Sequence, residues 1–107
     1  MSRFDDVLQR LTATIESRRG ADPATSWSAR LLADRVLAAK KLGEEALETA
    51  LAAAQNDPEA VAAESADLIY HWLVLLAAQG VSLDEVAARL EAREGVSGVA
   101  EKAGRSS

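Results

Sequence analysis

The sequence predicts an all-α protein, a single domain of four to five helices that forms a helical bundle completed by dimerisation. Apolar residues recur with helical spacing, and strand-like alternation never extends beyond a few residues. The 107 residues suffice for one domain with a modest core, and an apolar content of 49% is ordinary for a globular protein. Capping residues, prolines and glycines then divide the chain into segments of helical length.

The first predicted helix runs from Ser2 to Arg19. Its apolar residues fall on one stripe with i, i+3/i+4, i+7 spacing: Phe4, Val7, Leu8, Leu11 and Ile15. The following segment, Gly20–Thr25, contains Asp22-Pro23 and has the composition of a loop.

Ser26 is a suitable N-cap for a second helical stretch. This stretch passes through Trp27, Leu31, Leu32 and Val36 and continues, with or without a break, into the segment Lys40–Gln55. The sequence alone leaves the break open.

Asn56-Asp57-Pro58 is expected to end one helix and begin the next, with Asp57 as N-cap and Pro58 in the first turn. This third helix reaches Gln79, and Gly80 suits the position after its C-terminus.

Ser82-Leu83-Asp84-Glu85 has the pattern of a capping box and predicts a fourth helix to about Arg93. The sequence therefore divides into a helical domain, residues 1–93, and an irregular C-terminal tail, residues 94–107.

The third predicted helix is apolar on nearly every side between Leu68 and Ala78. A helix of this kind must be buried on several sides. In so short a chain we expect a second subunit to provide part of the cover, which predicts a homodimer. The apolar run is interrupted by His71 and is too short to span a bilayer, so no membrane association is expected.

Composition excludes several classes of function. The chain has no cysteine, which excludes disulfides, thiolate zinc sites and cysteine nucleophiles and agrees with a cytoplasmic location. No signal-peptide pattern opens the sequence. A net charge of −5 argues against nucleic acid as a partner.

Two acidic pairs are the most informative feature for function. Glu45 and Glu48 are three residues apart, as are Glu64 and Asp67, so each pair shares one face of its helix. If the two helices pack together, four carboxylates surround one small volume. Unit charges 5 Å apart repel by roughly 3 kcal/mol at an effective dielectric near 20, so the cluster requires a cation. Oxygen ligands favour Mg²⁺, or Mn²⁺, and carboxylate-bound divalent metals commonly serve phosphate chemistry.

An alternative interpretation is a solvated helix face with ion pairs Lys40–Glu44 and Lys41–Glu45. Such i, i+4 pairs are common and contribute only about 0.2–0.5 kcal/mol. They leave the carboxylates of Glu48 and of the second acidic pair unexplained, so the metal site is the preferred prediction.

The segment 41–48 (KLGEEALE) together with 64–71 (ESADLIYH) resembles the all-α nucleoside triphosphate pyrophosphohydrolase superfamily, with its E-x-x-E…E-x-x-D motif. Within it the chain is most similar to the phosphoribosyl-ATP pyrophosphohydrolase family. Further segments agree: 26–31 (SWSARL), 73–77 (LVLLA) and the tail 93–98 (REGVSG) with 101–103 (EKA). The similarity covers nearly the whole chain. The acidic motif alone indicates only the superfamily. The Tyr70-His71 extension and the tail are what make the chain resemble this particular family.

The resemblance implies Mg²⁺-dependent hydrolysis of phosphoribosyl-ATP to phosphoribosyl-AMP and pyrophosphate, the second step of histidine biosynthesis. The metal ligands are then Glu45, Glu48, Glu64 and Asp67, and Glu44, Glu45 and Glu48 are the catalytic residues, with Glu44 able to orient water or hold a second metal. The implied substrate-binding residues are Lys41, His71, Trp27, Arg30, Arg93 and Lys102. Taken without the resemblance, Trp27 suits the core, His71 suits a buried structural role, and the cations suit solvent.

The chain departs from the family pattern in two places. Trp27 stands where the family more often has tyrosine, and the segment Ala33-Asp34-Arg35-Val36 lacks the glycine that usually marks a break. Two other functions also remain: a house-cleaning pyrophosphohydrolase for (deoxy)nucleoside triphosphates, and a non-enzymatic helical interaction module.

Overall fold

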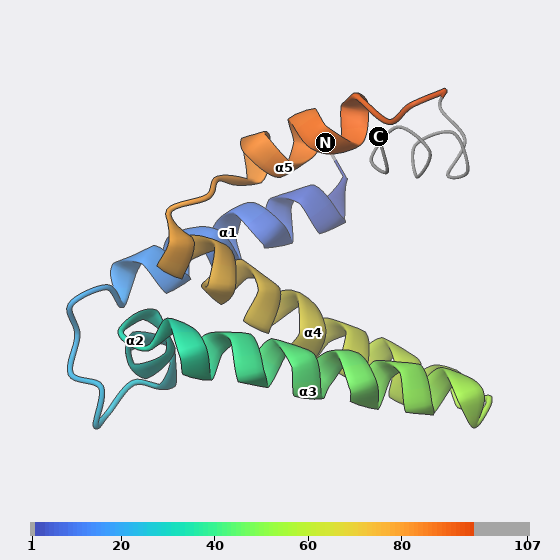
Figure 1. The fold of residues 1–107 in the computed structure, drawn as a ribbon, viewed down its shortest axis with the longest axis horizontal. Coiled ribbons are helices and arrows are strands. Elements are labelled where there is room, and N and C mark those ends of the chain that lie inside the picture. The colour runs from blue at the N-terminus through green and yellow to red at the C-terminus, as the bar shows by residue number, and fades with distance from the viewer. Residues whose placement is uncertain (1, 96–107) are drawn as a thin grey trace, which may run out of the picture.

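The computed structural model describes residues 2–95, and these residues form five helices and no strand (Figure 1). The helices are α1 Arg3–Ser17, α2 Trp27–Leu32, α3 Arg35–Ala54, α4 Pro58–Gln79 and α5 Leu83–Glu91. The long helices α3 and α4 run antiparallel and make the most extensive helix–helix contact. The predicted all-α class is confirmed.

The three predicted N-caps, Ser26, Asp57 and Ser82, are confirmed by hydrogen bonds from backbone N–H groups to the capping side chains, and Ser2 caps α1 in the same way. Each cap accepts from the residue three positions later: Asp5 N to Ser2 at 3.2 Å, and, at 3.1 Å each, Ala29 N to Ser26, Ala60 N to Asp57 and Glu85 N to Ser82. The Ser82–Glu85 capping box is complete. These side chains satisfy donors that a helix N-terminus otherwise leaves unpaired.

A break separates α2 from α3 although the segment has no glycine. Ala33 closes α2 in ordinary right-handed geometry, and the Asp34 side chain accepts a hydrogen bond from Leu37 N at 3.1 Å. Asp34 is therefore the N-cap of α3. The Asp34 carboxylate therefore takes the place of the glycine that usually marks this break, and it allows α2 to turn away from α3.

Replacing Asp34 with alanine is expected to cost about 1 kcal/mol of folding free energy, because the first turn of α3 loses its cap. Asp34→Asn retains an acceptor and should cost much less. Urea unfolding of the two variants measures the difference. Equal costs would mean that the cap does not contribute to stability.

The α3–α4 connection is short, as the sequence predicts. Asn56 adopts a left-handed conformation, with φ 56°, and Asp57 N donates to Ala52 O at 3.1 Å, which ends α3. At the other end of α4, Gly80 has φ 70° and Val81 N donates to Leu76 O at 2.9 Å. Both are helix C-terminal motifs that need a left-handed residue, which asparagine and glycine adopt most readily.

The core lies where the first four helices meet. Its buried side chains are Ile15 of α1, Leu31 of α2, Ala38 of α3, and Leu73 and Val74 of α4. Helix α5 contributes no buried residue and contacts the others less extensively.

Within one chain, helix α4 is only partly covered. Only His71, Leu73, Val74 and Leu76 are buried, and the other large apolar residues of its second half remain partly exposed. By length and composition alone α4 could span a membrane, with a mean hydropathy of 1.3, but it packs along α3 and supplies core side chains. On α3, Leu47 and Leu51 are 60% and 50% exposed. One chain therefore leaves part of α4 uncovered, and the expectation that a second subunit supplies the remaining cover stays a prediction.

Candidate metal and phosphate site

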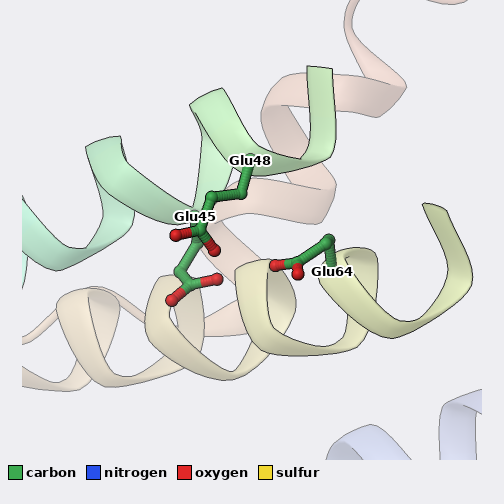
Figure 2. A group of neighbouring side chains, drawn as sticks. All are labelled: Glu45, Glu48 and Glu64. Atoms are coloured by element: carbon green, nitrogen blue, oxygen red, sulfur yellow. The ribbon is translucent and has the colours of Figure 1, made fainter. Parts of the chain in front are cut away.

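Three carboxylates from two helices meet between α3 and α4 (Figure 2). Glu45 and Glu48 project from one face of α3, and Glu64 projects toward them from α4. One oxygen of each lies within 4.8 Å of the others. The prediction that the acidic residues of the two helices converge holds for these three.

The cluster contains buried oxygen atoms without partners. Glu45 Oε2 and Glu64 Oε2 are inaccessible to solvent and make no hydrogen bond within residues 2–95. Buried polar atoms are normally hydrogen-bonded, and an unpaired carboxylate oxygen is especially costly. Three oxygen donors around one small volume form a ligand set suited to a hard divalent cation. The donor set therefore fits a metal such as Mg²⁺.

The carboxylates also oppose one another's ionisation. The pKa of Glu64 is raised to about 7, first because a protonated Glu64 can donate a hydrogen bond to the Glu48 carboxylate, then because of burial and the charges of Glu48 and Glu45. The pKa of Glu45 is raised as well, chiefly by burial and by the charge of Glu48. Near neutral pH and without a bound cation, Glu64 is therefore only partly deprotonated.

These shifts predict a pH-dependent stability of the metal-free protein. An acid whose pKa is raised on folding favours the folded state below its ordinary pKa, and that contribution is lost as pH rises toward the folded value. For Glu64 the window extends from about pH 4.5 to about 7. We expect the melting temperature of the protein in EDTA to fall across this window, unless another group compensates.

Added Mg²⁺ should reverse the loss. A metal present at a hundred times its Kd stabilises a folded protein by about 2.7 kcal/mol. Scanning calorimetry at pH 5 and pH 8 is therefore expected to show the larger Mg²⁺-induced increase at pH 8. A Mg²⁺ effect that is absent at both values would contradict the metal site, and choline chloride at equal ionic strength controls for general salt effects.

Asp67, the fourth predicted ligand, is placed differently. Its side chain is exposed and does not join the three-carboxylate cluster, although exposure alone does not separate it from Glu48, which is exposed and belongs to the cluster. Its charge nevertheless acts on Glu45, where it contributes to the raised pKa. Asp67 remains a predicted ligand.

His71 is buried, with 9% exposure, and its ring orientation is fixed. Nδ1 lies 2.8 Å from the Asp67 carbonyl oxygen, and since a carbonyl can only accept, Nδ1 carries the proton. The Tyr70 ring packs against the imidazole edge at a centroid distance of 4.9 Å. The other ring nitrogen, Nε2, is left as an acceptor whenever the imidazole is neutral.

About one helical turn before Glu45 on α3, the cation Lys41 lies beside Trp27. Lys41 Nζ lies 3.1 Å from Glu44 Oε2, whereas the alternative pairs Lys40–Glu44 and Lys41–Glu45 do not form in the described part of the chain. Lys41 Nζ and Arg30 Cζ each lie 5.8 Å from the centre of the Trp27 ring. With 41% exposure, Trp27 is not a core residue.

A hydrogen bond that sequence reasoning missed attaches α2 to α4. The hydroxyl groups of Ser28 and Tyr70 lie 2.6 Å apart. This bond holds the short helix that carries Trp27 and Arg30. No sequence pattern pairs two hydroxyl residues that lie 42 positions apart.

Of the two tail cations predicted to bind substrate, one lies in the described part of the chain. Arg93 is exposed in the turn after α5. Lys102, with most of the predicted tail 94–107, lies outside the described residues.

Comparison with known proteins gives consistent matches over nearly the whole chain. Residues 8–94 match the family described as Phosphoribosyl-ATP pyrophosphohydrolase. A protein from Caulobacter vibrioides named "Phosphoribosyl-ATP pyrophosphatase" is 67% identical over 103 residues, 96% of either chain. Relatives of the same name from Caulobacter sp. strain K31 and Cereibacter sphaeroides are 64% and 57% identical, over 100% of both chains and over 92% of this chain and 97% of the relative, respectively.

Proposed function

The chain belongs to the phosphoribosyl-ATP pyrophosphohydrolase family, and we propose that its three-carboxylate site carries out the family's reaction with a bound divalent metal. The enzyme hydrolyses phosphoribosyl-ATP to phosphoribosyl-AMP and pyrophosphate, the second step of histidine biosynthesis. The phosphoanhydride bond between the α and β phosphorus atoms breaks, and the oxygen of a water molecule forms the new P–O bond.

The observation that carries the metal proposal is the pair of buried, unpartnered oxygens on Glu45 and Glu64 beside Glu48. These three residues would hold Mg²⁺, with Mn²⁺ as a chemically similar substitute, and Asp67 is the proposed fourth ligand. When bound, the metal supplies charge neutralisation on phosphate oxygens and lowers the pKa of bound water.

The protein's own residues then bind and orient. Phosphoryl transfer depends mainly on positioning and on electrostatic stabilisation, so the nearby cations are as important as the acids. Lys41 offers its ammonium group to phosphate oxygens, and Glu44 holds that ammonium in place through their 3.1 Å ion pair. The tail cations Arg93 and Lys102 remain proposed substrate contacts.

His71 is proposed to act beside the substrate as a hydrogen-bond acceptor. Its protonated Nδ1 is engaged by the Asp67 carbonyl oxygen, which leaves Nε2 for a substrate hydroxyl group or for water. The carboxylate of Glu44 is the proposed alternative group for orienting water.

Pyrophosphate release from metal-stripped wild-type protein tests the proposed function. Phosphoribosyl-ATP, dUTP and ATP are each assayed with Mg²⁺, with Mn²⁺ and with EDTA. We expect rapid turnover of phosphoribosyl-ATP that requires the metal. Equal turnover in EDTA would remove the metal proposal, turnover of dUTP alone would favour a house-cleaning enzyme, and no turnover would favour an interaction module.

We also propose that the enzyme is a cytoplasmic homodimer. Helix α4 keeps partly exposed apolar residues, and Leu47 and Leu51 of α3 are half or more exposed, so one chain leaves its main helix pair incompletely covered. Exposed apolar surface of this kind marks interfaces. Light scattering should give twice the chain mass of 11.3 kDa, and a mass of one chain at 100 μM would reject the dimer.

A further inference from the structure

Two cations from different helices are held against one exposed aromatic ring. Arg30 belongs to α2 and Lys41 to α3, and each places its charge 5.8 Å from the centre of the Trp27 indole. A cation within about 6 Å of a tryptophan ring is attracted by the ring's negative face. We call Arg30 and Lys41 the cation pair.

Arg30 is available to bind a ligand, whereas Lys41 already forms an ion pair with Glu44 at 3.1 Å. Within residues 2–95 the Arg30 guanidinium makes no ion pair, and its only side-chain contact of this kind is with Trp27. The indole is 41% exposed, although tryptophan is usually well buried when it serves only the core. An exposed tryptophan that holds an unneutralised arginine is typical of a binding surface rather than of a packed interior.

The cation pair and the carboxylates form the two ends of one site. Lys41 lies four residues before Glu45 on α3, which corresponds to about one helical turn. The α2 helix that carries Arg30 is tied to α4 by the Ser28–Tyr70 hydrogen bond. Charge in the site is therefore divided, with acids at the metal end and cations toward α2.

The substrate of the proposed reaction is also divided. Phosphoribosyl-ATP has a triphosphate and, on its additional ribose, a separate monophosphate. The triphosphate reaches the carboxylates through a metal, whereas a phosphate without a metal would be repelled by the same carboxylates. The monophosphate therefore needs cations supplied by the protein.

We infer that Arg30 and Lys41 bind the monophosphate of the phosphoribosyl group and thereby select phosphoribosyl-ATP over nucleoside triphosphates that lack it. The inference rests on the proposed function. Arginine binds phosphate through two parallel hydrogen bonds and lysine as a point charge. Trp27 is a positioning residue, since it acts by holding the two cations.

Steady-state kinetics test the selection. Arg30→Ala should lower kcat/KM for phosphoribosyl-ATP by about 10- to 100-fold, the effect of losing charge-assisted hydrogen bonds, with most of the change in KM. Residual turnover of ATP, which has no monophosphate, should be unchanged. Arg10→Ala, an exposed arginine on α1, is the matched control and should resemble wild type. An equal loss on both substrates, or no loss on either, would overturn the inference.

Trp27 variants test positioning. Trp27→Tyr keeps an aromatic face and should retain most of the discrimination between phosphoribosyl-ATP and ATP, whereas Trp27→Leu should lose it through KM rather than kcat. Equal behaviour of the two variants would remove Trp27 from this role.

A binding measurement without turnover separates the inference from the proposed function. The chain has two tryptophans, so Trp72→Phe leaves Trp27 as the only tryptophan reporter. In EDTA, ribose 5-phosphate should change the Trp27 emission saturably, ribose should not, and Arg30→Ala should abolish the response. Identical responses to ribose and ribose 5-phosphate, or no response, would overturn the monophosphate subsite. Failure of wild-type enzyme to hydrolyse phosphoribosyl-ATP would instead overturn the function.

Discussion

Replacing Glu64 with glutamine is expected to lower metal-dependent hydrolysis of phosphoribosyl-ATP by about a thousandfold or more. The reason is the loss of one of three clustered ligand oxygens at a site where a metal contributes several kcal/mol to charge stabilisation. Turnover at saturating Mg²⁺ measures the effect. A wild-type rate would remove Glu64 from the site.

The same substitution should stabilise the metal-free protein at pH 8. Glutamine has a similar shape but no charge, so it relieves the repulsion that raises the pKa of Glu64 to about 7. The melting temperature in EDTA should therefore rise, and its increase on Mg²⁺ addition should shrink. Replacing a residue with a purely structural role would lower both activity and stability. A loss of activity together with a gain of stability therefore identifies Glu64 as a metal ligand.

Glu59→Gln is the matched control for Glu64→Gln. Glu59 is an exposed acid in the first turn of the same helix, outside the three-carboxylate cluster. Its replacement should leave turnover unchanged and alter the folding free energy by no more than about 0.5 kcal/mol. A comparable activity loss in this variant would show that general charge, rather than ligation, is being measured.

The largest expected effect on stability comes from Leu31. This side chain is fully buried in α2, and a buried Leu→Ala replacement typically costs 2–5 kcal/mol, through lost apolar contact and the cavity left behind. In a domain of this size, each kcal/mol lowers the melting temperature by about 4–8 °C. Calorimetry of Leu31→Ala should therefore show a decrease in melting temperature of about 8–40 °C.

Leu31→Ala should also affect substrate binding, because Leu31 anchors the short helix that carries Trp27 and Arg30. At temperatures where the variant remains folded, KM for phosphoribosyl-ATP should rise. Val36→Ala is the control: Val36 is nearby in sequence but 72% exposed, so it should change stability by no more than about 0.5 kcal/mol. Similar melting temperatures for the two variants would contradict the described core.

The helices and their boundaries could be predicted closely from the sequence. Caps such as Ser26 and Ser82, the Asp57-Pro58 start of α4 and the Gly80 end are local signals, and local hydrogen bonds determine them. The first helix ends at Ser17, slightly before the predicted Arg19, because the chain continues there in tighter turns with i→i+3 hydrogen bonds. The convergence of Glu45, Glu48 and Glu64 also followed from spacing, because a short turn makes α3 and α4 neighbours.

The remaining features depend on tertiary packing and on flexible side chains. Helical spacing fixes where each Cβ points, but it does not fix the end of a long side chain, so Lys41 pairs with Glu44 rather than with Glu45. Asp67 lies on the predicted stripe, yet its short side chain remains outside the cluster. The exposure of Trp27 depends on how α2 turns at Asp34, which the sequence leaves open.

The short Gln55–Asp57 turn has a consequence for how the protein assembles. All three clustered carboxylates lie between positions 45 and 64, within one helical hairpin, so joining them closes only a short loop and costs little chain entropy. Contacts that are local in sequence form early, on the microsecond-to-millisecond scale of low contact-order folds. The chelating groups can thus be brought together early in folding, without any contact from α5.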